Sequence, residues 1–176
     1  MPKKKSARHT APRAKALLLP MPCQRAAGFV LRARLALERL RNGEVDRPLV
    51  NQLGLTCMIT DFITEAGYGK LGQADIEQAQ HGLAQLLLGY GQMQQWPDAP
   101  PQLIDELTAV VNEYDRMLAT VRLEIIAQAT EHVDRLMAIV AAAPPTIAEL
   151  SRAFAPDASG SGPASAPASS PSHRKP

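Results

Sequence analysis

Apolar residues recur with helical spacing from residue 22 onward, and the first such stretch has two apolar sides. We predict a helix over Pro22–Asn42, because proline favours a first turn and the Asn-Gly pair at the end of this range favours a stop. Leu31 and Leu35 point away from its core face and need a cover of their own, from Leu17–Leu19 folding back, from another helix or from a second subunit. The core face itself collects Ala26, Phe29, Val30, Ala33, Leu37 and Leu40.

The next two stretches predict a buried central helix followed by an amphipathic one. Between Pro48 and Ala66, apolar side chains cover most of the helix circumference and leave a narrow polar strip near Asp61 and Glu65. A helix that is apolar nearly all round is a buried one, so we place it at the centre of the fold. A third helix, Gln73–Gln94, has one apolar face made of Ile76, Ala79, Leu83, Leu86, Leu87 and Tyr90.

A fourth helix is predicted to be unusually long. It begins at Pro101 and meets no helix breaker before Pro144, which gives about 42 residues and a length of about 63 Å. Its apolar seam follows coiled-coil spacing and then shifts to steps of four at Ile125. Helices of about 20 residues cannot cover its far half, so we expect that half to pack on a second copy of the chain. The residues assigned to an oligomer interface are Leu31, Leu35, Ile125, Val133, Leu136 and Val140.

These patterns predict an all-α protein, with a four-helix bundle over residues 21–143 that ends in a long C-terminal helix. Aromatic residues make up only 4% of the chain, so the core must be aliphatic, which suits helix-on-helix packing. We expect disorder in the basic arm at residues 1–20 and in the Pro/Ala/Ser-rich tail at residues 155–176. Residues 144–154 predict a short helix with a capping box at Thr146–Glu149, which either docks back on the body or binds a partner.

Charge is sorted by position. Residues 1–41 carry a net charge of +10 and residues 42–143 carry −9, whereas the whole chain carries +2. A basic arm on an acidic body favours a polyanionic partner or self-association through opposite charges. The alternatives are a solubilising tail and an arm that lies on the protein's own acidic body.

Double-stranded DNA is the polyanion that we expect, because no aromatic residue is interleaved with the arm cations to stack on single-stranded bases. The residues assigned to its phosphates are Lys3, Lys4, Lys5, Arg8, Arg13, Lys15, Arg25, Arg32 and Arg39.

The sequence offers little for catalysis or metal binding. Only His81 and His132 lie in the predicted bundle, no third ligand can be placed with them, and the Glu-x-x-His pair of di-iron bundles is absent. Phosphate-binding glycine loops, the nucleophile elbow and the HExxH motif are absent from the sequence as well. We therefore expect a non-enzymatic protein with no metal, no cofactor and no small-molecule substrate.

A helix-turn-helix can be laid on Asp46–Glu65, with Gly54 at the turn, but the template fits poorly. Its recognition helix would expose Asp61 and Glu65 and has no Lys or Arg, so it would repel phosphates. An uninterrupted second helix is the better interpretation.

The two cysteines, Cys23 and Cys57, have no CxxC spacing; a disulfide between them is one alternative, and a buried reduced Cys57 is the expectation. No apolar run approaches the length of about 18 residues that spans a membrane. The short run at Ala16–Leu19 is ended by Pro20, too early for a secretory signal. We expect a cytoplasmic protein with no membrane partner.

Three stretches, RLALERLRNGEVDRPLVNQL, DFITEAGYG and LTAVVNEYDRML, together give residues 32–138 a resemblance to short bacterial all-helical proteins. Some of those proteins are named Fis-family transcriptional regulators. The resemblance implies a dimer of four-helix subunits that ends in a basic helix-turn-helix. This chain has no Arg/Lys-rich final helix, so no functional residue is carried over from that family.

Two hypotheses of function follow. The first is a non-enzymatic DNA-associated or regulatory protein, a homodimer, whose basic arm contacts phosphates. The second is a helical protein–protein interaction or oligomerisation module with no nucleic-acid role. The sorted charge and the resemblance favour the first.

Overall fold

The computed structural model describes residues 16–142 together with Pro144, Thr146 and Glu149. In chain order, its elements are α2 (Cys23–Arg41), α3 (Arg47–Ile63), the π-helical turn η1 (Thr64–Tyr68), α4 (Gln73–Met93), α5 (Pro101–Thr120) and α6 (Leu123–Ala142). These described residues include no strand, which confirms the all-α prediction for this part of the chain.

The predictions for the arm at residues 1–15, for the tail at residues 155–176 and for most of the predicted short helix lie outside the described residues. Thr146 and Glu149 are described, and they make capping-box hydrogen bonds. Glu149 Oε2 accepts from the Thr146 amide at 2.8 Å and from the Thr146 hydroxyl at 2.9 Å.

Local sequence signals set most helix ends. Asp46 caps α3 by accepting a hydrogen bond from the Leu49 N–H at 2.7 Å, and Pro48 lies in the first turn. Gly43, just after α2, has a φ of 81°, a left-handed conformation that glycine adopts without strain. The first and third predicted helices agree with α2 and α4 to within one residue at each end. Because α3 runs through Gly54 without a break, the interpretation of an uninterrupted helix is confirmed.

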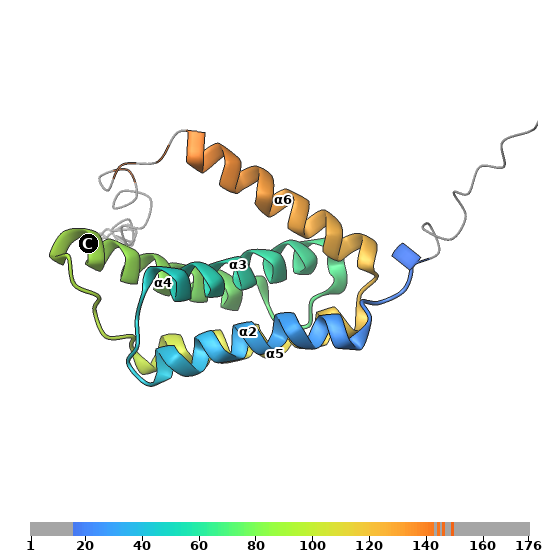
Figure 1. Cartoon of the computed structure of the whole chain (residues 1–176), viewed down its shortest axis with the longest axis horizontal. Coiled ribbons are helices and arrows are strands. Elements are labelled where there is room, and N and C mark those ends of the chain that lie inside the picture. The colour runs from blue at the N-terminus through green and yellow to red at the C-terminus, as the bar shows by residue number, and fades with distance from the viewer. Residues whose placement is uncertain (1–15, 143, 145, 147–148, 150–176) are drawn as a thin grey trace, which may run out of the picture.

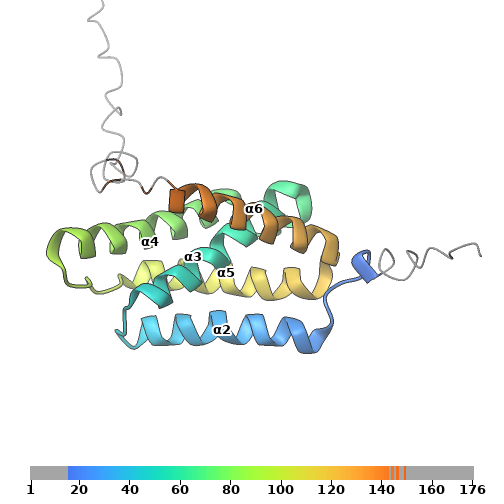
Figure 2. The same ribbon diagram turned by 45° about the horizontal axis from the view of Figure 1, so that its top comes forward.

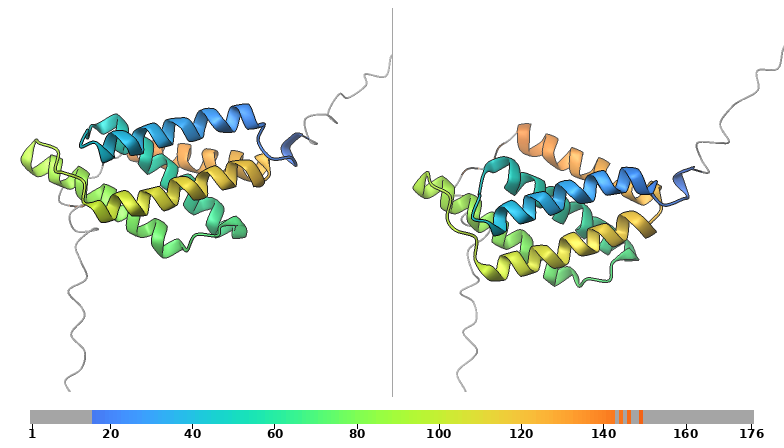
Figure 3. Two further views of the ribbon diagram at one scale, coloured as in Figure 1. Left: turned by 90° about the horizontal axis from the view of Figure 1, so that it is seen from below. Right: turned by 60° about the horizontal axis from the view of Figure 1, so that its bottom comes forward.

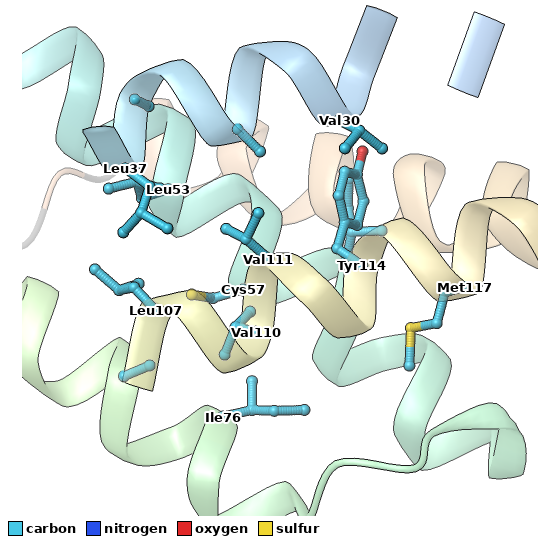
Figure 4. Packing of buried hydrophobic residues seen from close by; sticks show 14 of the residues in the cluster. Val30, Leu37, Leu53, Cys57, Ile76, Leu107, Val110, Val111, Tyr114 and Met117 are labelled. Carbon is cyan, nitrogen blue, oxygen red and sulfur yellow. The ribbon is translucent and has the colours of Figure 1, made fainter. Parts of the chain in front are cut away.

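The helices are arranged around α3. Helices α2 and α5 run antiparallel side by side, and α3 crosses them (Figures 1 and 2). Helix α4 packs on α3 and α5, and α6 packs on α3 (Figure 3). Leu53 and Cys57 of α3 are fully buried and gather with Leu37 of α2 and with Leu107 and Val110 of α5 (Figure 4). The predicted central position of this helix is confirmed by these neighbours.

The prediction of one long C-terminal helix is wrong, because the chain turns at Val121 and Arg122. Helix α5 ends at Thr120, and Val121 is extended, with φ −84° and ψ 144°. An isolated bridge pairs Arg122 with Pro20, and the Leu123 N–H donates to the Leu19 carbonyl at 2.8 Å. The N-terminal segment thereby satisfies a backbone donor that the break sets free.

The turn gives five α-helices in the described chain instead of the predicted four. It directs α6 back over α3, where Ile126, Ala129 and Val133 are buried. A straight continuation of α5 would carry these three side chains away from the core. Their burial supplies the physical reason for a break that no proline or glycine marks.

The central helix ends three residues before its predicted end at Ala66. Regular α-helix stops at Ile63, and the wider turn η1 then leads to Gly67, which has a φ of 86°. The carboxylate of Glu113 on α5 fastens the loop that follows. Glu113 Oε1 accepts from the Lys70 amide at 2.6 Å, and Arg116 donates to both carboxylate oxygens, at 2.6 and 2.8 Å. The hydrogen bonds from Arg116 and then from Lys70 outweigh burial and hold the pKa of Glu113 at about 2.

Acid is expected to remove the stabilisation that Glu113 provides. Folding lowers its pKa from 4.5 to about 2, so the contribution is complete above pH 4.5 and is lost as the pH falls from there towards 2. We expect Glu113→Gln to lower the free energy of unfolding by about 2 kcal/mol near pH 7, and by less than about half as much near pH 3. Urea unfolding followed by circular dichroism measures both values. Glu131→Gln, at an exposed carboxylate of α6, is the control, and an equal loss for Glu113→Gln at both pH values would contradict the assignment.

Two helix glycines are expected to respond in opposite ways to alanine. A Cβ at Gly82 in α4 would lie 2.5 Å from Leu103 Cδ1 of α5, whereas a Cβ at Gly54 in α3 would meet nothing within 4 Å. Because alanine favours a helix over glycine by about 1 kcal/mol, we expect Gly54→Ala to stabilise the protein by up to about that amount. Gly82→Ala should give no gain or a loss, since the buried Leu103 has to shift. Thermal and urea unfolding test this pair, and equal gains at the two sites would contradict a close approach of α4 to α5.

Candidate functional site

The described phosphate-contact candidates divide into two kinds. Arg25 and Arg32 are exposed on α2 and make no ion pair within the described residues. Arg39 instead donates to Glu44 Oε2 and to Asp46 Oδ2, both at 2.8 Å, and these two hydrogen bonds raise the pKa of its guanidinium. Arg39 therefore braces the loop between α2 and α3. The remaining candidates, Lys3, Lys4, Lys5, Arg8, Arg13 and Lys15, lie outside the described residues.

The interface candidates on α2 lie on the surface. Leu31 is 58% exposed and Leu35 is 55% exposed, and no described part of the chain covers them. Leu17–Leu19 do not fold over this strip, because they are themselves exposed and the segment bonds to the turn before α6.

The interface candidates on α6 have diverse surroundings. Val133 is 1% exposed, so most of its side chain packs in the core of its own chain, and it also lines the apolar groove described below. Its assignment to an oligomer interface stays a prediction. Ile125 and Leu136 are half-buried, and Ile125 packs against the core. Val140, near the end of the helix, is 46% exposed.

An apolar groove lies between α3, α4 and α6. Its volume is about 610 Å³. Apolar side chains form most of its lining, among them Val50, Leu55, Met58, Leu83, Leu87 and Met137. The polar groups that line it are amides, apart from the carboxylate of Asp134. Leu55 and Met137 are exposed, so the groove opens to solvent through apolar side chains.

Small residues and the direction of α6 produce this groove. Gly54 on α3 and Ala84 on α4 line it and leave space where larger side chains would meet. Helix α6 packs on α3 and rises away from α2 and α5 towards its C-terminal end (Figure 1). Two apolar walls therefore lie beside a helix end that no other described segment encloses.

A smaller cavity of about 210 Å³, between α3, α4 and α6, is acidic on one wall. Asp61 and Glu65 line it together with His132, whose ring packs on Phe62 with a centroid distance of 5.0 Å. Burial raises the pKa of Asp61, against the effect of a hydrogen bond from Gln80. Within the described residues, no three His, Cys, Asp or Glu side chains are placed to hold a metal ion.

Both cysteines are free thiols. Cys57 is buried, as expected, and burial raises the pKa of its thiol to about 12. Cys23 is exposed at the start of α2. In the part of the chain that the structure describes, no helix is both long enough and apolar enough to cross a membrane.

Comparison with family models, curated proteins and solved structures gives no match to this chain. The resemblance to Fis-family proteins accordingly rests on the three sequence stretches that carry it.

Sequence reasoning did not find the groove, since its walls come from three helices whose mutual placement depends on the turn at Val121. One signal was present in the sequence. Residues 136–142, LMAIVAA, are apolar on every side of a helix, which is unusual for an end that lies at the surface.

Proposed function

We propose that this protein is a non-enzymatic interaction module that binds an apolar helix in the groove between α3, α4 and α6. The observation that carries the proposal is the groove itself, with a volume of about 610 Å³, apolar walls and an opening flanked by exposed Leu55 and Met137. Open apolar surfaces of this kind are typical of binding sites, because exposing them to water is unfavourable.

The shape and chemistry of the groove favour a helix as its ligand. Its long walls are themselves helices, and a helix laid between them presents anchors at i, i+3 or i+4, and i+7. Only Asp134 contributes a charge to the lining, so a polar or highly charged ligand would lose hydration without gaining partners. Selectivity then comes from apolar shape, with Asp134 favouring a cation at the edge of the ligand.

A model peptide tests the proposal. We expect the chain to bind a fluorescent, alanine-based helical peptide with leucines at i, i+3 and i+7, and to ignore the same peptide with serines there. Ala84→Phe fills the groove and should weaken binding by at least about tenfold, as measured by fluorescence anisotropy. Ala74→Phe, at an exposed position of the same helix, is the matched control and should bind normally. Equal binding by the two variants would show that the peptide does not occupy the groove.

A second candidate function is phosphate binding to double-stranded DNA through the basic arm and α2. It is supported by the net charge of +10 over residues 1–41 and by Arg25 and Arg32, which are exposed and form no ion pair with any other described residue. Arg34 and Arg41 contribute less, since they pair with Asp115 at 2.8 Å and Glu38 at 2.9 Å.

Salt dependence tests this second function. Removing residues 1–15 eliminates six cations and leaves intact the Leu19 and Pro20 contacts that fasten the turn before α6. With each phosphate contact worth about −0.9 in the slope of log K against log salt, we expect this truncation to flatten the slope by about five, and Arg32→Ala by about one. Duplex-DNA titrations between about 50 and 200 mM salt measure the slopes. Absence of binding at the lower salt concentration would rule this function out.

A further inference from the structure

No described part of the chain covers most of the last two turns of α6. Residues 136–142, LMAIVAA, carry no charge, and Met137 and Ile139 are 54% and 64% exposed. A surface helix ordinarily keeps a polar face, and one that is apolar all round is stable only where it is enclosed. Residues 136–142 therefore have the composition of a buried helix, although several of their side chains are exposed.

The chain's own groove accounts for only one side of this end. Val140 lies on the same side of α6 as the buried Val133, close to the groove residue Met137. At about 100° per residue, Ile139 is turned about 120° from Val133, which places it on the far side. A ligand that only filled the groove would leave Ile139 in water, whereas a second copy that packs on both sides of this end covers it.

We propose that α6 of a second copy of this chain occupies the groove, with two chains exchanging their α6 ends about a two-fold axis. Each chain offers one open apolar groove and one uncovered apolar helix end, and those two features lie next to each other. In a two-fold dimer, each groove binds the helix end of the other chain, so both grooves and both helix ends are buried. The inference rests on the proposed function, since it names the helix that the groove binds.

Charge agrees with this occupant. The inserted end has no charged side chain, and the groove lining has only Asp134. Arg47, beside the lining residue Pro48, is exposed and makes no ion pair within the described residues. An α6 that enters with its C-terminus towards Pro48 brings the negative end of its helix dipole to this guanidinium.

Sedimentation equilibrium of the full chain, at about 1 to 100 µM, tests the exchange. We expect the wild type to sediment with twice the chain mass of 19.0 kDa at the upper concentrations. Ile139→Asp damages the inserted helix and Ala84→Phe blocks the groove, so each should weaken the dimer by at least about tenfold. Arg47→Glu should weaken it by a smaller factor. Leu31→Asp, on the separate apolar strip of α2, is the control and should remain dimeric.

Mixing the two damaging variants separates an exchange from other dimers. Ile139→Asp keeps an intact groove, and Ala84→Phe keeps an intact helix end. In an exchanged dimer, the intact helix end of the Ala84→Phe chain can occupy the intact groove of the Ile139→Asp chain. The mixture should therefore contain a heterodimer, although each variant alone is mostly monomeric. Two α6 ends that packed only on each other would not regain association in this way.

The outcomes are distinct from those of the peptide experiment. A wild type that binds the leucine peptide and stays monomeric overturns the exchange and leaves the interaction module standing. A dimer that is lost in Leu31→Asp and kept in Ala84→Phe also overturns it, in favour of α2. A full chain that stays monomeric, while a chain lacking residues 144–176 dimerises, overturns it in favour of the chain's own C-terminal segment. Failure of both peptide binding and dimerisation would reject the proposed function together with the exchange.

Discussion

The apolar surface around α3 is the constraint on which the rest of the structure depends. Its buried residues, among them Val50, Leu53 and Ile59, spread over about half of the helix circumference, so this helix needs several neighbours. Helices α2 and α5 supply two of these neighbours and α4 supplies a third. The remaining side of α3 is covered only if the chain reverses direction after α5, which explains the turn between α5 and α6. The Leu19 carbonyl stabilises this turn by accepting a hydrogen bond from the Leu123 N–H. The groove arises where this last cover is incomplete.

Sequence patterns identified the local elements well and their assembly less well. Helical periodicity, the prolines at the helix starts and the Asn42-Gly43 stop are short-range signals, and they predicted both ends of α2 and α4 and the start of α3 to within one residue. The turn at Val121 has no such signal, because its cause is long-range: the burial of Ile126 and Val133 against a helix about seventy residues earlier in the chain. The same limit explains Val133, which periodicity placed on an outer seam and the fold places inside.

Part of the charge that looked available to partners is used within the body. Arg34 reaches Asp115 on α5, and Arg39 reaches Glu44 and Asp46 in the next loop. Exposed pairs of this kind each contribute little stability, about 0 to 1 kcal/mol. Their larger effect is to offset positive charge at Arg34 and Arg39, which lie on opposite edges of α2. The positive charge of the N-terminal region that remains lies in the residues before α2 and on Arg25 and Arg32.

The placement of the two thiols makes their relative alkylation rates a measure of core opening. Cys23 is exposed at the beginning of α2, whereas Cys57 is enclosed in α3 with a thiol pKa of about 12. Alkylation proceeds through the thiolate, so a reagent in solution modifies Cys23 directly and reaches Cys57 only when the core opens. The ratio of the two labelling rates in a single sample would therefore report how often the helices around α3 separate, with no added dye or engineered residue.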